Sequence, residues 1–300
     1  MMPAVNGCYK EDGTLDNLHA DSGVRRIRPV KAYLGSLLVY AILGVTALGI
    51  LLPLLLMVSA AFKSESEIFS YPIHWIPAKV IWDNFKQLQH SFPVYTFNSL
   101  KVTAIITLVQ IVTATTGAYA FAKLRWKGRD LLFMLYIASI MIPQQIVIIP
   151  QFIIVRNLGL YDTHLALILL GSFTAFGTFL VKQYFMTIPD SLLEAARIDG
   201  ANDFVIFGRI MLPLAKPVIA TQVIFSFRYF WNDFFTPMIY ITKESLKTIP
   251  LGMSDFTTQY TVYYGPQMAG CLISIIPVII VFLAAQKYFV QGIAAGGVKG

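Results

Sequence analysis

The charged residues best placed to do chemistry gather in one short polar stretch, PDSLLEAARIDGAND, at residues 189–203. The stretch holds four acidic side chains and one arginine, and long apolar runs flank it on both sides. An enzyme would need a paired nucleophile and base or a metal-binding histidine pair, and the sequence offers neither. The residue types indicate helix capping and contact with a partner rather than catalysis.

Other chemistry is excluded by spacing. Cys8 and Cys271 lie far apart, one in a polar tail and one in an apolar run, which argues against a disulfide or a metal site. The four histidines show no ligand spacing; they are His19, His74, His90 and His164. No phosphate-binding GxxxxGK[ST] loop occurs, so the chain is predicted to have no catalytic residue, no metal and no ATPase activity of its own.

The composition indicates a membrane protein. Of 300 residues, 56% are hydrophobic and 13% are charged, whereas soluble domains carry about 25% charged residues. The net charge of +7 could suggest a nucleic-acid partner, but the charges cluster in short segments between apolar runs. That pattern is typical of the loops of a multispanning membrane protein.

Six apolar segments are long enough to cross a bilayer, which takes about 20 residues. They lie between Lys31 and Lys63 and at 102–122, 131–155, 163–181, 216–241 and 267–286. The sequence thus predicts an all-α integral membrane protein with six transmembrane helices. An N-terminal tail would cover 1–31, a transmembrane domain 32–290 and a C-terminal tail 291–300.

Lysine and arginine are about twice as frequent in alternate loops, beginning with the N-terminal tail. The positive-inside rule therefore predicts that both termini are cytoplasmic. The polar stretch would then be cytoplasmic, between spans four and five. The outer loop 63–94, which contains Trp75 and Trp82, is expected to be an interfacial surface segment without a soluble domain.

The polar stretch predicts two short helices at about 190–212. Ser191 and Glu194 have the spacing of a capping box, and Gly200 can end the first helix in the left-handed conformation. Asn202 or Asp203 can cap the second helix. Its expected apolar face consists of Phe204, Ile206, Phe207 and Ile210. The many apolar residues of the first helix indicate a partner surface rather than exposure to water alone.

At this point the sequence resembles a known family. Glu194-Ala195-Ala196, Gly200, Ile210 and Leu212-Pro213 reproduce the signature of ABC-importer membrane subunits, in the form typical of carbohydrate uptake. Further stretches are similar to the maltose-type second permease: MIPQQIVIIPQF, LGLYDTHLALIL, FWNDFFTPMIYI and the tail QGIAAGGVKG. The resemblance covers roughly residues 30–300.

The resemblance implies a permease subunit of a bacterial inner-membrane importer. Its partners would be a different permease, two ATP-binding subunits that carry ATP and Mg²⁺, and an extracytoplasmic solute-binding protein. The first short helix would be the coupling helix that docks on an ATP-binding subunit. The coupling residues implied are Glu194, Ala195, Ala196, Asp199, Gly200, Ile210, Leu212 and Pro213. Pro213 would set the start of span five.

The resemblance also gives the tail a role. Residues 294–300 read as too flexible to form a helix alone. The tail, with Gly296, Gly297 and Lys299, would reach between the two ATPase subunits.

Polar and aromatic residues inside the spans are candidates for a substrate pathway, because sugars bind aromatic faces and hydrogen-bonding side chains. The candidates are Gln144, Gln145, Gln222, Tyr229, Trp231, Asn232 and Asp233. Each of them could instead serve helix packing. Arg228 lies about 140° around the helix from Asp233, which argues against a direct ion pair.

Several alternatives remain open from the sequence. A non-sugar solute such as a glycerol phosphodiester or a polyanion is compatible with the same family, and so is a homodimer. A secondary transporter would need ion-coupling acids inside the membrane, and only Asp233 is a candidate.

Overall fold

The computed structural model describes residues 30–257 and 261–297. The regular elements of these residues are helices, joined by turns and loops, apart from an isolated β-bridge between Thr257 and Val262. Two compact units make up the chain, residues 1–52 and 53–300. The first unit holds most of α1 (Val30–Ala61), whose side chains from Leu37 to Leu52 are exposed. The predicted N-terminal tail, except its last two residues, lies outside the described part of the chain.

The second unit contains the remaining elements. They are α2 (Glu65–Ile68), α3 (Asp83–Lys86), α4 (Phe92–Ala122), α5 (Arg129–Ala138), α6 (Gln144–Asn157), α7 (His164–Gly171), α8 (Ala175–Met186), α9 (Asp190–Ile198), α10 (Asp203–Ile206), α11 (Leu212–Leu214), α12 (Lys216–Trp231), α13 (Phe235–Tyr240), α14 (Ile249–Met253) and α15 (Tyr264–Gly297). A π-helical turn, Phe207–Met211, joins α10 to α11.

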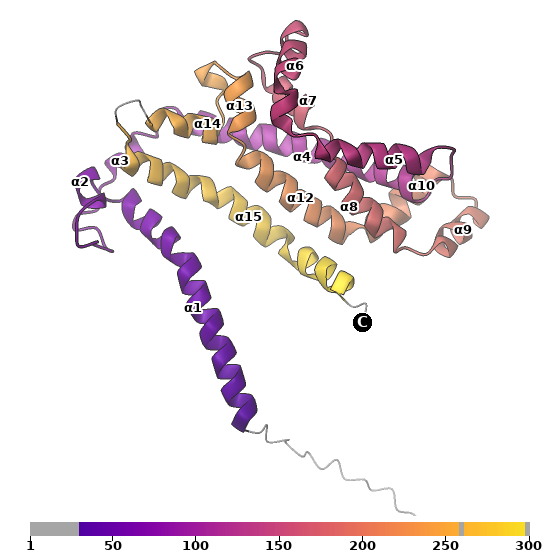
Figure 1. Ribbon diagram of the computed structural model, residues 1–300, viewed down its shortest axis with the longest axis horizontal. Coiled ribbons are helices and arrows are strands. Elements are labelled where there is room, and N and C mark those ends of the chain that lie inside the picture. Colours follow the sequence, from indigo (N-terminus) through magenta and orange to yellow (C-terminus); the bar gives the residue numbers. More distant parts are fainter. Residues whose placement is uncertain (1–29, 258–260, 298–300) are drawn as a thin grey trace, which may run out of the picture. The chain divides into compact units, whose positions relative to one another are not determined.

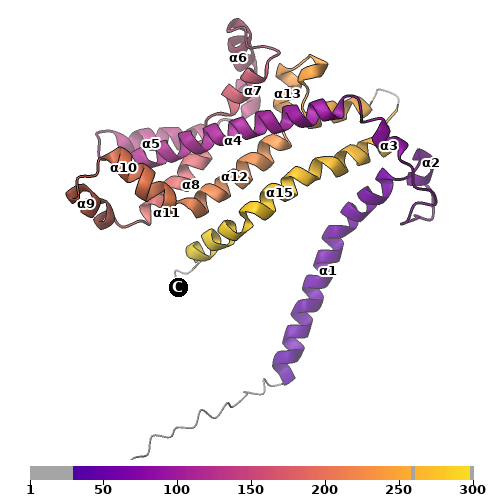
Figure 2. The ribbon, with the colours of Figure 1, turned by 180° about the vertical axis from the view of Figure 1, so that it is seen from behind.

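Within this unit α12 packs against α4, α8 and α15, and α4 packs against α8 (Figure 1). In both ribbon views α9 and α10 lie at one end of this group, and α3 lies at the other (Figures 1 and 2); Figure 1 shows α14 near α3. α6, α7 and α13 stand together on one side. The short polar helices α9 and α10 therefore lie apart from the region where α6, α7 and α13 meet the long helices.

Four helical segments of the described residues are long and apolar enough to cross a membrane: Leu37–Ala61, Phe92–Ala122, His164–Met186 and Tyr264–Lys287. Two bent pairs raise the number to six if each is one span. The prediction of an all-helical protein is confirmed. The structure supports four to six spans.

The predicted third span, 131–155, is not a straight helix. Arg129–Met141 and Gln144–Asn157 meet at 99°. Pro143 has no N–H to donate, and Ile142 before it is extended, with ψ of 112°. A proline disfavours helical geometry in the residue that precedes it, so this proline produces the bend.

The predicted fifth span, 216–241, was wrong at its end. α12 stops at Trp231, and α13 begins four residues later. Asn232 Nδ2 donates to the Arg228 carbonyl at 2.8 Å, and Asp233 Oδ1 accepts from the Thr236 N–H at 3.1 Å. These side chains take over backbone hydrogen-bonding partners, which ends one helix and starts the next.

Two smaller expectations also need correction. Pro213 lies in α11 rather than at the start of α12, where Pro217 occupies the first turn. The structure continues α15 through Gly297, so 294–297 are helical, because extending an existing helix avoids the cost of nucleation. Lys299 lies outside the described residues.

Candidate functional site

The predicted coupling stretch forms two short helices, as expected. α9 ends in a Schellman motif, in which the Gly200 N–H donates to the Arg197 carbonyl and the Ala201 N–H donates to that of Ala196. Gly200 has φ of +84°, the left-handed conformation predicted for it. Asn202 caps α10, and its Oδ1 accepts from the Val205 N–H at 2.9 Å.

The predicted capping box is absent. Helix α9 begins at Asp190, one residue before Ser191, and its N-cap is Pro189 without a side-chain cap bond. Pro189 is extended, with ψ of 136°, and a buried lysine engages Asp190 instead. Lys123 Nζ lies 2.5 Å from Asp190 Oδ1 and 2.6 Å from the Ile188 carbonyl oxygen. This hydrogen bond and its charge hold the pKa of Asp190 below its usual value.

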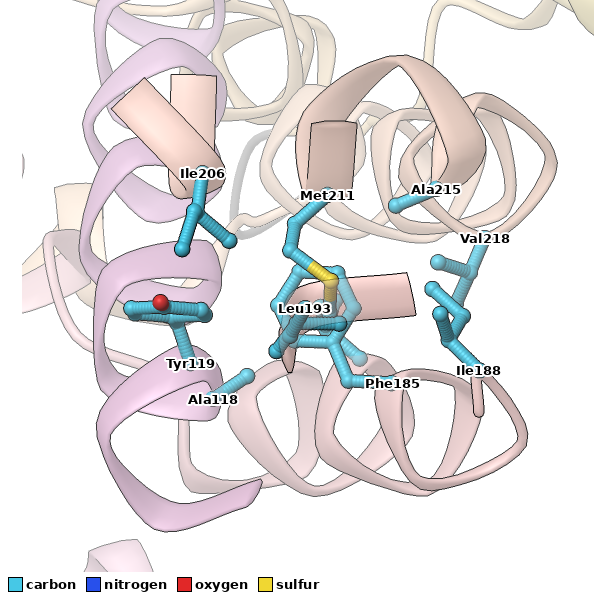
Figure 3. Close-up of a cluster of buried hydrophobic side chains, with 10 residues drawn as sticks. Ala118, Tyr119, Phe185, Ile188, Leu193, Ile206, Met211, Ala215 and Val218 are labelled. Atoms are coloured by element: carbon cyan, nitrogen blue, oxygen red, sulfur yellow. The ribbon is translucent and has the colours of Figure 1, made fainter. Parts of the chain in front are cut away.

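A buried apolar cluster supports both helices from behind. Leu193 of α9 and Ile206 of α10 point into it with Phe185 and Met211 (Figure 3). Tyr119 of α4 lies in the same cluster, and its hydroxyl donates to Asp203 Oδ1 at 3.2 Å. The same Asp203 oxygen accepts from Arg197 Nη2 at 3.0 Å. These contacts fix α9 and α10 to each other and to α4.

The outer surface of this segment stays apolar in part. Ile198 and Phe204 are 86% and 87% exposed, and Leu192 is 43% exposed. The expectation that Phe204 shares one apolar face with Ile206 was wrong. Phe204 and Ile206 are two residues apart and therefore lie about 200° apart around a helix, so they cannot share one face.

The predicted coupling residues divide by position. Glu194, Ala195, Asp199 and Gly200 are exposed, and Ala196 is half-buried. Ile210 is half-buried against the apolar cluster, Leu212 is half-buried, and Pro213 is exposed. Neither Glu194 nor Asp199 makes an ion pair with any residue that the structure describes. The exposed coupling residues therefore lie on the outer side of this short segment, and the half-buried ones lie on its inner side.

A second candidate site is a cavity of about 610 Å³. Residues of α4, α6, α7, α8, α12 and α13 line it. Of the predicted pathway residues it includes Gln144, Gln222, Tyr229 and Asp233. The volume falls within the range typical of small-molecule sites.

Three predicted pathway residues lie elsewhere. Trp231 is 2% exposed, stacks on Phe227 with ring centroids 5.5 Å apart and donates from Nε1 to the Ser274 carbonyl. It serves helix packing between α12 and α15. Asn232 bonds the Arg228 carbonyl, and Gln145 is exposed outside the cavity lining.

Sequence reasoning missed several polar lining residues. Gln110 and Thr103 of α4, Gln151 of α6 and Thr248 all line the cavity. A glutamine such as Gln110 inside an apolar run was a usable signal. Threonines gave none, because in a helix they commonly bond the carbonyl four residues earlier. Arg228 and Asp233 make no ion pair with each other among the described residues, as their spacing predicted. Within those residues no group of three or more His, Cys, Asp or Glu side chains could hold a metal ion.

Comparison with known proteins gives a consistent result. Residues 110–295 match the family described as "Binding-protein-dependent transport system inner membrane component". The chain is 36% identical to the probable ABC transporter permease protein YurM of Bacillus subtilis, over 90% of this chain and 91% of the relative. It is 32% identical to the arabinooligosaccharides transport system permease protein AraQ of Halalkalibacterium halodurans, over 83% and 91%.

A solved structure shares the architecture. A chain of a bacterial ABC transporter involved in the import of the acidic polysaccharide alginate superposes with a TM-score of 0.76 and 26% identity. The match covers 86% of this chain and 98% of that one. The fold, the matched profile and the relatives agree, and the chain therefore belongs to the family of binding-protein-dependent transport system inner membrane components, the permease subunits of ABC transporters.

Proposed function

We propose that the chain is one of two different membrane subunits of an ATP-driven importer that takes up a carbohydrate. The observation that carries this is similarity over most of the chain to permeases named for arabino-oligosaccharide and alginate transport. The partners would be two ATP-binding subunits, which hold ATP and Mg²⁺, and a solute-binding protein that delivers the sugar. Family membership favours this over a secondary transporter.

In this proposal each bent pair counts as one span, which gives six spans. The chain would lie in the inner membrane of a bacterium, with both termini in the cytoplasm. The lysine and arginine distribution supports that orientation. It places α9 and α10 on the cytoplasmic side, where an ATP-binding subunit is accessible. The tail with Gly296, Gly297 and Lys299 would reach the same partner.

α9 would be the coupling helix. Its exposed apolar residue Ile198 and the neighbouring Phe204 offer a surface suited to a hydrophobic groove. Glu194 and Asp199 are exposed and make no ion pair within the described residues, so they can meet cations on the partner. Ala195 and Gly200 present little side chain and allow close approach.

The contacts behind α9 would carry its motion into the membrane. Leu193 lies in the apolar cluster with Phe185 of α8 and Ala215, which immediately precedes α12. Lys123 joins the C-terminal end of α4 to Asp190. Ile210 and Leu212 would support this connection rather than touch the partner. When the ATP-binding subunits close, a two-state rearrangement of the long helices follows from differential binding.

Purification of the tagged chain from its native membrane tests the assembly. The proposal requires a second, different permease and an ATP-binding subunit to co-purify. Uptake of labelled saccharides by the reconstituted assembly, with the solute-binding protein present, then tests the cargo. Uptake of a non-sugar solute only, or recovery of the chain with copies of itself only, would contradict it.

Charge reversal tests the role of α9. Glu194→Lys should leave membrane insertion intact while ATP hydrolysis no longer drives uptake. Asp83→Lys is the control, because Asp83 is an exposed carboxylate in α3, at the other end of the unit (Figure 1). Normal uptake by Glu194→Lys with its ATPase bound would show that the coupling assignment is wrong.

A further inference from the structure

Three residues that line the cavity carry a buried oxygen. Among the described residues, three buried side-chain oxygens lack a hydrogen-bond partner: Thr103 Oγ1, Gln222 Oε1 and Thr248 Oγ1. All three residues line the cavity, and they are 1%, 3% and 5% exposed. A buried oxygen without a partner costs about 1–3 kcal/mol, so such groups are rare unless something else satisfies them.

A chain of amides gives Gln222 its orientation. Gln110 Nε2 donates to the Gly171 carbonyl at 2.6 Å, which leaves Gln110 Oε1 as an acceptor. Gln222 Nε2 lies 3.5 Å from that oxygen. The amide of Gln222 is thereby turned so that its Oε1 remains unpaired. This oxygen can only accept, so its ligand must donate.

Glycine makes room for this amide. A Cβ at Gly177 of α8 would come within 2.5 Å of Gln222 Nε2. Only a residue without a side chain leaves the amide in place. The position of Gln222 is therefore set by α8 as well as by α4.

The same cavity is lined by aromatic rings and carries little net charge. Phe176 and Phe225 have ring centroids 6.2 Å apart, and Tyr229 and Phe230 have theirs 4.9 Å apart. Its charged lining residues are one cation and one carboxylate, Arg228 and Asp233. Asp233 already accepts from the Thr236 N–H.

From this arrangement we propose that this subunit itself binds an uncharged, polyhydroxylated ligand in the cavity, with Thr103, Gln222 and Thr248 as contacting residues. Sugar hydroxyls donate to the amide oxygen of Gln222, which can only accept, and exchange hydrogen bonds with the two threonine hydroxyls. The C–H faces of a sugar ring pack on the aromatic rings. A polyanion would bring excess negative charge to a cavity whose lining carries one cation and one carboxylate. The proposal rests on the proposed function and narrows its cargo.

Thiol protection tests the site directly. Thr103→Cys and Thr248→Cys are made separately with Cys8 and Cys271 replaced by serine, in the complete importer reconstituted in lipid. A small methanethiosulfonate reagent labels the new thiol. Neutral oligosaccharides, including arabino-oligosaccharides, should slow labelling at least about tenfold when present at ten times their half-saturating concentration. Alginate oligosaccharides of matched length should not.

Transport gives a second readout. Thr103→Val and Gln222→Met remove the contacting groups with little change in size, and each should raise the half-saturating saccharide concentration about tenfold. Thr115→Val is the matched control, since Thr115 is equally buried on α4 but lies outside the cavity and bonds the Ile111 carbonyl. Thermal melting of each variant reports whether the assembly remains folded.

The outcomes separate the two proposals. Uptake of neutral sugars without protection at either cysteine, and with unchanged half-saturation in both variants, overturns the inference and leaves the carbohydrate importer standing. Equal or better protection by alginate overturns the uncharged ligand class. If no saccharide is taken up while a non-sugar solute is, the proposed function itself fails.

Discussion

The polar groups of the α9–α10 segment and those of the cavity differ in their exposure and in their hydrogen bonding. In the segment the polar groups are exposed, and Asp190 and Asp203 are paired with Lys123 and Arg197. Among the residues that line the cavity, Thr103, Gln222 and Thr248 are buried, and each carries an oxygen without a partner among the described residues. On its inner side the segment forms its hydrogen bonds within the chain, whereas the proposed ligand would supply the missing partners in the cavity.

The difference follows from what each region contacts. A segment that docks on another protein has to hold its shape before docking, so its internal bonds are made within the chain. A cavity that selects a small molecule leaves its hydrogen-bonding groups free for that molecule. The following changes act on one region or the other, from the largest expected effect on folding to the smallest.

Gly200→Pro should have the largest effect. Proline fixes φ near −65°, whereas Gly200 has φ of +84°, and it removes the N–H that caps α9. The substitution should destabilise the segment by roughly 3 kcal/mol or more and abolish coupled uptake. Gly200→Asn is the control, because asparagine tolerates the left-handed region. Uptake and ATP hydrolysis are measured together. Intact coupling in the proline variant would show that coupling does not require the left-handed turn at Gly200.

Asp162→Ala should act on the cavity through the loop beside it. Asp162 Oδ1 accepts from the N–H groups of Thr242 and Lys243 at 2.9 and 3.0 Å, next to α13, whose residues Thr236 and Pro237 line the cavity. Losing these charge-assisted bonds should cost about 2–3 kcal/mol and lower the melting temperature. Asp162→Asn keeps one acceptor oxygen and should lose less.

The same residue gives a pH dependence. Burial opposes ionisation of Asp162, but the backbone N–H groups of Lys243 and Thr242 outweigh it and lower the pKa to about 2. A lowered pKa stabilises the folded state above the usual value of 3.8, and this stabilisation is lost as the pH falls toward 2. Thermal melting of wild type and Asp162→Ala should therefore differ fully at pH 5 and converge near pH 2. A difference that shrinks already between pH 7 and pH 5 would contradict this assignment.

Gly177→Ala tests whether the packing of α8 holds the Gln222 amide in place. The new methyl group would collide with the Gln222 amide, so overpacking should cost about 1–3 kcal/mol and weaken saccharide binding. Gly208→Ala is the matched control, since nothing lies within 4 Å of its Cβ and it should stabilise by about 0.5–1 kcal/mol. Equal melting temperatures and equal uptake for both variants would show that Gln222 is not held in place by Gly177.

Ile198→Ser with Phe204→Ser should change folding least. Both side chains are more than four-fifths exposed, so the free energy of unfolding should change by no more than about 0.5 kcal/mol. The melting temperature should therefore stay close to that of the wild type. Recovery of the ATP-binding subunit in a pull-down should nevertheless fall at least tenfold, because exposed apolar anchors dominate docking. Unchanged recovery would leave α9 without its proposed contact surface.

Local sequence signals predicted local structure well. Gly200 was predicted to adopt the left-handed conformation, and Asn202 was one of two residues predicted to cap the second helix; both features occur. Errors arose where distant residues decided the outcome. Lys123, 67 residues away, engages Asp190, and the helix begins there instead of at the capping box. Thr103 and Thr248 could not be assigned, because only the packing of distant helices brings them to one cavity.

The π-helical turn at Phe207–Met211 has a consequence for how this protein can change in length. A π turn holds about one residue more than an α turn. Deleting one residue there lets the segment return to α geometry, whereas a deletion within α12 would rotate every following side chain by about 100°. Loss of one residue in this turn therefore leaves the cavity lining of α12 in its register.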